Sequence, residues 1–354
     1  MNFIEYAKNY TQKINNAIKG IYDRKINSVS NPFLKNYYLE LKNYFLSGGK
    51  RIRPILSIAT YNAFSENQDD KIVLPSVGVE FLHNASLIHD DIIDKDDFRR
   101  GAPAFHFRFR NYHQQYNLKK MNNIDFGNSI GIIGGDTAFF LGLEAFLYSN
   151  FESELNFKAM NYYEQAFIEI ANGVLIETDM VNQRDSTIQD YINMISLKTG
   201  ALIEKSILIG ANYANTDEKC LKDLSIYGIN LGIIFQIIDD ILGTFGDEKI
   251  TGKPKNDIRE GKKTCLLIEA LNTLEEKDKS NLQKLIENPN MSDYDVQRVK
   301  DLFLKADVIN SCKNLAKSYF QEAKLSLENL KDDINNLEAE IFEDLLNFVM
   351  TRKF

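Results

Sequence analysis

Apolar residues recur at intervals of three and four along much of the chain, with polar and charged residues between them. The pattern is clear over residues 139–146 and 166–175, and again over 316–350. Such spacing places the apolar side chains on one face of an α-helix. Prolines interrupt helices, and none occurs between Pro103 and Pro254. The sequence therefore predicts several long helices and no turn-punctuated β-region.

Asparagine-rich segments at residues 111–128 and 288–293 are predicted loops. Neither is long enough to separate independent domains, so we predict one all-α domain over residues 1–354. No apolar stretch reaches the roughly 18 to 20 residues of a membrane span. The N-terminal residues lack the basic and apolar regions of a secretory signal. A cytoplasmic protein without a transmembrane segment is expected.

Composition narrows the class of protein. The chain has 354 residues, of which 44% are hydrophobic and 26% charged, so it can bury a core. Its net charge of -8 argues against a nucleic-acid binder, which needs a basic face. Cys220, Cys265 and Cys312 are widely spaced and form no CxxC pair, so core thiols are expected rather than a disulfide framework or a zinc site.

The segment SLIHDDIIDKDDFRRG contains the first candidate site. Asp90 and Asp94 stand four positions apart, on one helical face, with Asp91 beside them. Like charges so placed weaken a helix, and their natural use is to bind a divalent cation such as Mg²⁺ through hard oxygen ligands. Paired aspartates occur elsewhere in the chain, so a solvated acidic surface is the alternative. The apolar residues on both sides favour the metal site.

A near copy of this segment occurs in GIIFQIIDDILGTFGDEK, where Asp239 and Asp240 follow an equally apolar run. Two apolar helices that each deliver adjacent aspartates suggest carboxylates facing across a cavity. Several Mg²⁺ ions could then bridge a polyphosphate between the two helices.

Basic residues suited to a diphosphate lie near the first acidic motif. SGGKRIRP supplies Lys50, Arg51 and Arg53, and Arg99 and Arg100 follow the aspartates directly. Arginine makes bidentate contacts with phosphate, and backbone N–H groups at the glycine pair could add to them. A plain turn is the alternative for the glycines.

Further candidates lie downstream and on the first acidic helix. DYINMISLKTG supplies Lys198 and Thr199, and TGKPKNDIREGKKT supplies four lysines, at 253, 255, 262 and 263; a solvated basic loop is equally compatible. His83 precedes Asp90 by about two helical turns and either assists an anionic ligand or is a core histidine. The spacing of the four histidines matches no zinc signature.

Taken together, GGKRIRP, HDDIIDKDDFRRG, GGD, KTG, FQIIDDILG and GKPKNDIREGKKT resemble the trans-isoprenyl diphosphate synthases in their usual order, over about residues 47–264. The sequence looks most like the archaeal-type geranylgeranyl diphosphate synthases. The resemblance implies an all-helical bundle around a central cavity, usually a homodimer. It also implies Mg²⁺-dependent condensation of isopentenyl diphosphate with an allylic diphosphate, by ionisation, condensation and loss of a proton.

The resemblance also implies roles for individual residues. The metal ligands, for three ions with diphosphate bound, would be Asp90, Asp91, Asp94, Asp239 and Asp240. The allylic diphosphate would meet Arg99, Lys198 and Lys253, with Lys262 or Lys263 as a further contact. Thr199 and Gln236 would face the allylic cation. Isopentenyl diphosphate would meet Gly49, Lys50, Arg53, His83 and Arg100.

The chain also departs from the family pattern. Gly243 replaces the third aspartate of the second motif, and Asp247 or a water is expected to compensate. GVLIE stands where GQ followed by an aspartate is usual, so Val174 and Glu177 put one polar cavity contact in doubt. The residues near YNLKKMNN are predicted to be an exposed loop insertion without a catalytic role.

Product length in this family depends on the residues that plug the cavity below the first motif. Ala85 and Ser86 are small, which argues against a fifteen-carbon stop, while Leu82 and Phe139 or Phe140 could form a floor. A twenty-carbon product is predicted, with a farnesyl or longer-chain product as the alternative. A class I terpene cyclase would carry a different second metal motif and would lack GGKRIRP. A non-catalytic regulatory subunit of the same fold would have no reason to keep so many like-charge clusters.

Overall fold

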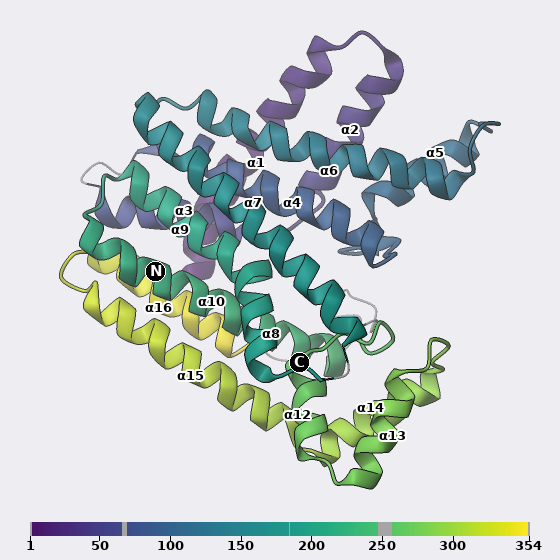
Figure 1. Cartoon of the computed structure of the whole chain (residues 1–354). Helices are drawn as coiled ribbons and strands as arrows, with labels where there is room; N and C mark the ends of the chain where they lie inside the picture. Colours follow the sequence, from purple (N-terminus) through teal and green to yellow (C-terminus); the bar gives the residue numbers. More distant parts are fainter. Residues whose placement is uncertain (1, 66–68, 184, 247–256, 353–354) are drawn as a thin grey trace. The chain divides into compact units, whose positions relative to one another are not determined.

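The computed structural model describes residues 2–65, 69–183, 185–246 and 257–352, and helices dominate these residues (Figure 1). The single β-pair among them consists of two-residue strands. The all-α fold class predicted from sequence is therefore confirmed. In chain order the elements are α1 (Phe3–Ser28), α2 (Pro32–Leu46), α3 (Ile52–Phe64), η1 (Asp70–Ile72), α4 (Val73–Ile93), β1 (Phe98–Arg99), β2 (Ala102–Pro103), α5 (Phe105–Gln115), α6 (Asn123–Leu147), α7 (Ser153–Asn182), α8 (Ile188–Ile195), η2 (Ser196–Gly200), α9 (Ala201–Tyr213), α10 (Glu218–Phe245), α12 (Cys265–Thr273), α13 (Glu276–Ile286), α14 (Asp293–Lys305), α15 (Val308–Asn329) and α16 (Asn336–Met350).

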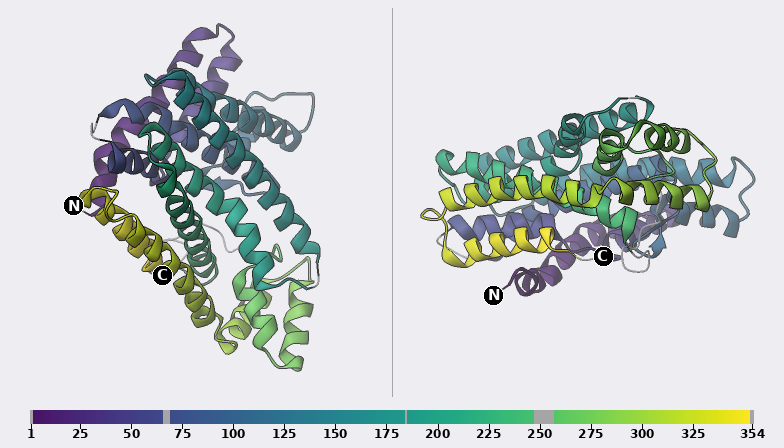
Figure 2. Two further views of the ribbon diagram at one scale, coloured as in Figure 1. Left: turned by 60° about the vertical axis from the view of Figure 1, so that its left-hand side comes forward. Right: turned by 90° about the horizontal axis from the view of Figure 1, so that it is seen from below.

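The chain divides into two compact units. The first comprises Met1–Glu164 with Ser206–Asp217, and the second comprises Gln165–Lys205 with Glu218–Phe354. In the first unit α4 packs along α6, and α5 also lies against α6. In the second unit α10 lies beside α15 and α16, as the views in Figure 2 show. The prediction of a single domain stays a prediction.

Local sequence signals explain where these helices begin. Asn31 accepts hydrogen bonds from two backbone N–H groups at the start of α2, whose first residue is Pro32. Thr187 and Asp190 form a capping box at the start of α8. The proline-free region contains the two longest described helices, α7 and α10, and the 25-residue α6, so the predicted long helices are present.

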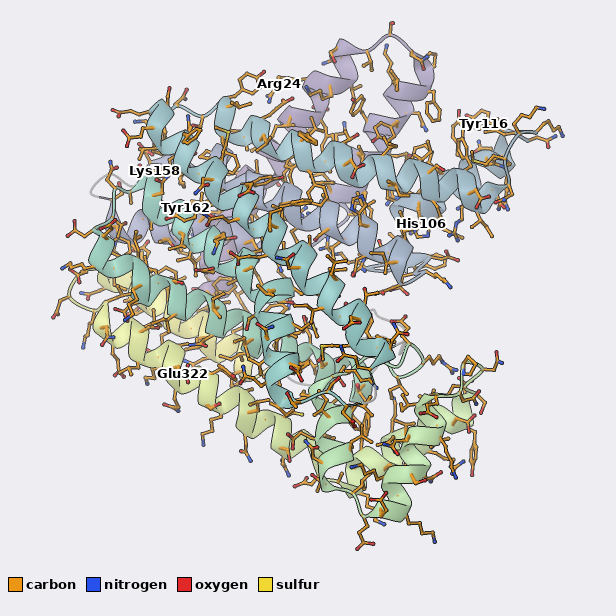
Figure 3. The ribbon with its side chains drawn as sticks, viewed as in Figure 1. Arg24, His106, Tyr116, Lys158, Tyr162 and Glu322 are labelled. Atoms are coloured by element: carbon orange, nitrogen blue, oxygen red, sulfur yellow. The ribbon has the colours of Figure 1, made fainter. Side chains whose placement is uncertain are left out.

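One predicted loop was wrong in its extent. The expected loop at residues 111–128 is mostly helical, because α5 continues to Gln115 and Asn122 caps α6 from Asn123. A short connection remains, in which the side chain of Tyr116 is 57% exposed (Figure 3). The amphipathic C-terminal region is two helices, α15 and α16, separated by a turn. The three cysteines are buried thiols, as predicted.

Two of the described helices, α6 and α10, are long and apolar enough to cross a membrane by length and composition alone. In α10 most of the apolar window is buried inside the protein, as in the core helix of a soluble protein. In α6 less than half of it is buried, and Ile132, Ile133 and Phe140 are exposed. The prediction that no stretch is long and apolar enough to span a membrane is therefore not confirmed, although these two helices are only weak evidence for a span.

Candidate active site

The first acidic motif lies at the C-terminal end of α4 in the first unit. Asp90 and Asp91 are in its last turn, and Asp94 caps the helix by donating its N–H to the carbonyl of Asp90. The C-terminus of a helix bears partial negative charge, and no basic residue occupies this last turn. Three carboxylates here oppose the helix dipole, so the arrangement is costly for stability unless a cation neutralises it.

Asp91 is fully buried, and Arg99 and Tyr44 hold its two oxygens. The Nε of Arg99 donates to Oδ1, and the hydroxyl of Tyr44 donates to Oδ2 at 3.2 Å. Arg99 also reaches Oδ2 of Asp90, at 3.5 Å. Burial raises the pKa of Asp91 to about 7 although Arg99 opposes the shift. The carboxyl therefore lies where more positive charge would stabilise its ionised form.

A tight hairpin places Arg99 on these carboxylates. β1 pairs with β2 in antiparallel register, Arg99 opposite Ala102, and the two residues between them, Arg100 and Gly101, both have positive φ. Positive φ at both central positions is the geometry of a two-residue hairpin turn, and glycine favours it. Arg99 therefore turns back onto the aspartates that precede it by only a few residues.

Arg100, on the same turn, contacts the glycine pair of SGGKRIRP. It donates to the carbonyl of Gly48 at 3.0 Å. Gly49 has φ near +112°, and a Cβ there would lie 3.0 Å from the guanidinium of Arg100. This turn therefore requires glycine and brings Gly49 and Arg100, both predicted to contact isopentenyl diphosphate, together.

Arg51, two residues beyond Gly49, has a different role from its basic neighbours. It is 3% exposed and donates to Glu80 at 2.6 Å, to Asn15 at 3.0 Å and to the carbonyl of Phe45 at 2.6 Å. A buried ion pair with all these hydrogen bonds satisfied fixes the loop. Arg51 is thus a structural residue that supports its neighbour Lys50, which is exposed.

His83 lies on α4 among the arginines of this region. Burial lowers the pKa of its imidazole well below the usual value, and Arg53, Arg100, Arg99 and Arg51 lower it further. The ring is therefore neutral at physiological pH and can donate or accept a hydrogen bond. The first unit thus brings His83 near Arg53 and Arg100, and Arg100 against the turn at Gly49, while their predicted contact with isopentenyl diphosphate stays a prediction.

The residues predicted to set product length also belong to the first unit. Leu82 and Ala85 are fully buried on α4, and Ser86 is half-buried. The ring of Phe139, on α6, packs edge-on against His89 with centroids 5.5 Å apart. Phe140 is 74% exposed, so Phe139 is the better candidate of the two for a cavity floor.

The second acidic motif lies on α10, and Asp240 is its buried member. The hydroxyl of Tyr191 donates to Oδ2 and the amide of Gln236 donates to Oδ1, both at 2.7 Å. Thr199 in turn donates to the Gln236 carbonyl oxygen at 2.8 Å. Burial raises the pKa of Asp240 to about 7, and the nearby Asp257 adds to the shift. Thr199 and Gln236, predicted to face a cation, therefore form one network with a predicted metal ligand.

Asp239, the half-buried member of the pair, contacts an arginine from far along the chain. Arg352 follows α16 and donates from Nη1 to Oδ1 of Asp239 at 2.8 Å. Its guanidinium also lies over the ring of Phe235, 4.0 Å from the centroid. Nothing in the sequence near residue 352 indicated this contact.

The KTG segment forms η2, a single π-helical turn, a type of irregularity common at functional sites. A Cβ at Gly173 would lie 2.5 Å from the backbone nitrogen of Lys198, so α7 approaches this turn closely only because the residue is glycine. The ammonium of Lys198 pairs with Glu177, also on α7. Glu177 thus retains a polar contact at the position where the family pattern is broken.

Asp257 is the carboxylate found beside Gly243. Its Oδ2 lies 3.4 Å from the position of a Cβ at Gly243, and Lys262 approaches its other oxygen at 3.7 Å. Lys262 also pairs with Glu260 at 2.9 Å, and burial lowers the pKa of Lys263. The sequence pattern NDIREGKKT contains Asp257 but predicted no role for it. Asp247 and Lys253 lie outside the described residues.

Each acidic motif has the donor chemistry of a divalent-cation site, although no group of three or more His, Cys, Asp or Glu side chains converges in the described part of the chain. The ligands would be hard carboxylate oxygens, and a bound cation would favour the ionised forms of Asp91 and Asp240, whose pKa values burial raises. Mg²⁺ meets both conditions, so the residues fit it.

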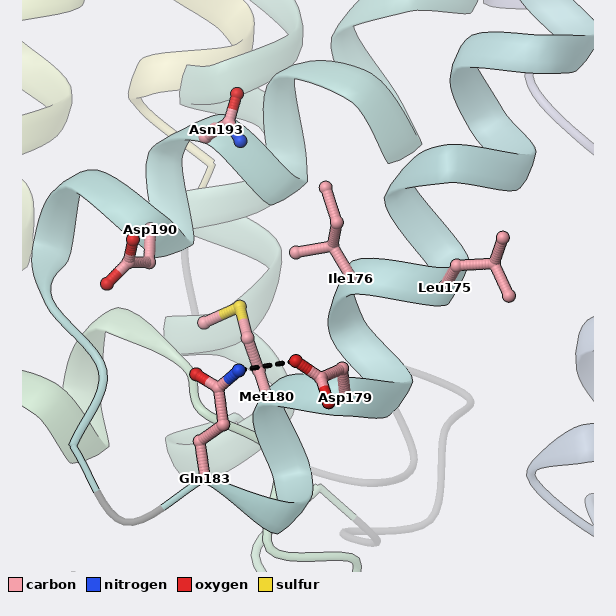
Figure 4. Close-up of a pocket in the computed structure, with 7 residues that line it drawn as sticks. All are labelled: Leu175, Ile176, Asp179, Met180, Gln183, Asp190 and Asn193. Atoms are coloured by element: carbon pink, nitrogen blue, oxygen red, sulfur yellow. Dashed lines mark hydrogen bonds between the residues drawn. The ribbon is translucent and has the colours of Figure 1, made fainter.

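Two of the pockets formed by the described residues lie in the second unit. One, of about 310 Å³, lies between the end of α7 and α8, and its lining contains no lysine or arginine (Figure 4). The described residues that line it therefore offer no cationic group to a diphosphate. The other, of about 360 Å³, is lined by Ile238, Ile241, Leu242, Lys313, Met350, Thr351 and Arg352.

Comparison with known proteins agrees with this arrangement. Residues 35–303 match the family described as polyprenyl synthetase. The chain is 33% identical to the short chain isoprenyl diphosphate synthase of Methanocaldococcus jannaschii, over 98% of this chain and 96% of that protein. It is 32% identical to the geranylgeranyl diphosphate synthase of Sulfolobus acidocaldarius, over 99% of this chain and 100% of that protein. The chain belongs to the polyprenyl synthetase family.

Solved structures support the same assignment. This polyprenyl synthetase has a TM-score of 0.81 and 29% identity with geranylgeranyl pyrophosphate synthetase from Pyrococcus horikoshii, covering 99% of this chain and 98% of that one. It shares its fold with geranylgeranyl pyrophosphate synthase from Corynebacterium glutamicum, with a TM-score of 0.91 at 24% identity and 100% of both chains covered. That structure contains isoprenyl diphosphate and magnesium. The predicted family and prenyltransferase class are confirmed, and the predicted use of a divalent metal is supported.

Proposed function

We propose that this polyprenyl synthetase condenses isopentenyl diphosphate with allylic diphosphates to give geranylgeranyl diphosphate. The observation that supports this most directly is the pair of acidic motifs, each with one buried carboxylate that needs positive charge and each accompanied by arginine or lysine. The relatives named geranylgeranyl diphosphate synthase support the substrate class and are compatible with the twenty-carbon product.

The basic residues of each unit would bind and orient the two diphosphates. Arg53, Arg100 and neutral His83, with Lys50 beside the glycine turn, suit isopentenyl diphosphate, because they form one basic region in the first unit. Lys198 and Arg99, with Lys262 or Lys263, suit the allylic diphosphate. Those that now pair with a carboxylate would exchange or share that partner when the diphosphate binds. Preorganised donors of this kind stabilise the charge that develops on a departing diphosphate.

Mg²⁺, when bound by Asp90, Asp91, Asp94, Asp239 and Asp240, would act as a Lewis acid that stabilises the leaving diphosphate. The chain's own residues would orient the reacting allylic group. The hydroxyl of Thr199 and the amide of Gln236, joined by a 2.8 Å hydrogen bond, present oxygen dipoles toward an allylic cation. We propose three ions, as the family resemblance implies.

Product length would be set on α4. Ala85 and Ser86 leave space one turn before the aspartates, and buried Leu82 lies one turn deeper. A phenylalanine at residue 86 would fill that space, so Ser86→Phe is expected to shorten the main product from twenty to fifteen carbons. An unchanged product would contradict this account of the cavity.

We also propose a cytoplasmic homodimer with one domain per chain, in which α6 supplies much of the interface. Ile132, Ile133, Phe140 and Leu147 are between 50% and 74% exposed on this helix. A row of large apolar side chains on one helix is typical of a surface that another protein covers. A second copy of the chain accounts for it without a membrane.

The decisive experiment is an incubation of purified protein with isopentenyl diphosphate, Mg²⁺ and each of dimethylallyl, geranyl and farnesyl diphosphate, followed by chromatographic sizing of the products. EDTA and Asp90→Ala serve as controls. A Mg²⁺-dependent linear twenty-carbon product is expected. A product of another length would keep the chemistry and refute the assigned length, and no product from a folded sample would favour a non-catalytic subunit.

A further inference from the structure

Arg352 lies beside the second acidic motif because α16 packs firmly on α10. The hydroxyl of Tyr227, on α10, donates to the carbonyl of Phe342 at 2.8 Å, and the two rings pack edge-on. The core-facing residues of α16, Ile341, Phe342, Leu345 and Leu346, are almost fully buried. α16 ends at Met350, so Arg352 lies two residues beyond a helix that is packed on α10.

Three contacts hold the guanidinium of Arg352, and only one of them is Asp239. The group lies over the ring of Phe235, 4.0 Å from the centroid, and Nη2 approaches the carbonyl of Phe235 at 3.4 Å. Phe235 and Asp239 are one helical turn apart on α10, so they offer a single binding face. The side chain of Arg352 is 13% exposed. Phe235 and the packing of α16 would therefore keep the arginine in place while the second oxygen of Asp239 binds another ligand.

The contact with Asp239 takes one carboxylate oxygen and leaves the other. Nη1 donates to Oδ1 at 2.8 Å, and Oδ2 has no hydrogen bond from the described residues. The Asp239 side chain is 33% exposed, so this second oxygen can meet a ligand from solution. A charge-assisted hydrogen bond to one oxygen fixes the torsions of a carboxylate and so aims the other.

We propose that Arg352 is a positioning residue for Asp239, holding Oδ1 so that Oδ2 is presented to the divalent cation. The proposal rests on the proposed function, because it takes Asp239 as a metal ligand. Outer partners that hydrogen-bond a ligating carboxylate contribute to metal affinity, and their loss typically weakens it about 10- to 100-fold. The arginine's own charge opposes a metal ion. The direction of the change on removing it therefore tests the proposal.

The test uses Mn²⁺, which electron paramagnetic resonance detects, with the full chain and inorganic diphosphate. Four variants are compared with the wild type: Arg352→Gln, Arg352→Lys, Asp239→Asn and the neighbouring control Thr351→Ala. Arg352→Gln should raise the Kd for Mn²⁺ about 10-fold or more. Arg352→Lys should restore part of the affinity, because an ammonium can still donate to Oδ1. Thr351→Ala removes a hydroxyl that donates to the carbonyl of Asn347 and should match the wild type.

The double variant Asp239→Asn with Arg352→Gln separates positioning from a general loss of structure. It should bind Mn²⁺ no more weakly than Asp239→Asn alone, because the arginine would act only through that carboxylate. If Arg352→Gln does not fold, Arg352→Lys carries the same comparison with a smaller expected change. An unchanged Kd in Arg352→Gln would overturn the proposal. A lower Kd would overturn it too and would identify Arg352 as a competitor of the metal.

A parallel condensation assay on the wild type separates this inference from the proposed function. If the wild type condenses the diphosphates and Arg352→Gln binds Mn²⁺ normally, the inference alone fails. If the wild type neither binds Mn²⁺ with diphosphate nor forms product, the proposed function and the inference fail together. Weaker Mn²⁺ binding in Arg352→Gln supports the positioning role whatever the product of the wild type.

Discussion

Asp91 in the first acidic motif and Asp240 in the second are both buried, and burial raises the pKa of each carboxyl to about 7, yet their partners differ. Asp91 pairs with a cation, Arg99, which lies eight residues away on the next hairpin. Among the described residues Asp240 has the neutral donors Tyr191 and Gln236, and the arginine of the second motif contacts Asp239 instead. The first motif thus contains its own counter-charge, whereas the second needs distant segments and an incoming cation.

Removing the half-buried carboxylate of each motif should have the largest effect. Asp90→Ala and Asp239→Ala are each expected to lower the condensation rate about 10³-fold, equivalent to about 4 kcal/mol, because both would remove a metal ligand. Steady-state rates at saturating Mg²⁺ measure this. Asp70→Ala, which removes an exposed ion pair with Lys13, is the matched control and should leave the rate unchanged. Full activity in either motif variant would show that the two motifs do not act together.

Removing the counter-charge of the first motif should reduce stability most. Arg99→Gln leaves Asp91 buried without a cation, which is expected to lower the free energy of unfolding by about 3 to 5 kcal/mol. Urea denaturation at neutral pH measures the change. Lys13→Gln breaks an exposed pair and should change the same quantity by less than about 1 kcal/mol. Equal effects of the two substitutions would contradict the internal counter-charge.

The same contrast explains how far the sequence alone could lead. Arg99 was predictable because the hairpin that returns it to Asp91 is encoded within a few residues. Tyr44, Tyr191 and Arg352 were missed, because helix packing between distant segments brings them to the aspartates and no local motif signals it. The long helices followed from apolar spacing and missing prolines. The boundary at residues 111–128 failed because an asparagine-rich composition also contains the cap of α6.

The neutral donors allow a finer comparison of the two motifs. Tyr191→Phe removes a 2.7 Å hydrogen bond from Asp240, which has no cationic partner among the described residues, and should lower the free energy of unfolding by about 1 to 3 kcal/mol. Tyr44→Phe removes a 3.2 Å bond from Asp91, which keeps Arg99, and should have the smaller effect. Thermal and urea denaturation of both variants check the order. The reverse order would show that Arg99 does not compensate for the lost hydroxyl.

The pH dependence of stability should also differ between the two units, because all four histidines belong to the first. Burial, with help from Arg110, lowers the pKa of His106 to about 4, whereas the unfolded value is near 6.5. The unfolded state therefore binds a proton first, so this contribution to stability is complete above pH 6.5 and is lost as the pH falls toward 4.

The expected loss from His106 is about 1 to 3 kcal/mol across that range. Its ring is buried and its Nε2 lies 3.6 Å from Asp97, whose charge stabilises the imidazolium less than burial and Arg110 destabilise it. His106→Leu keeps an apolar side chain of similar size without a titrating group, and it should flatten the slope of unfolding free energy between pH 6.5 and 4. Urea denaturation at half-unit steps of pH measures that slope. An equally steep slope in the variant would assign the acid sensitivity to the carboxylates instead, which both units share.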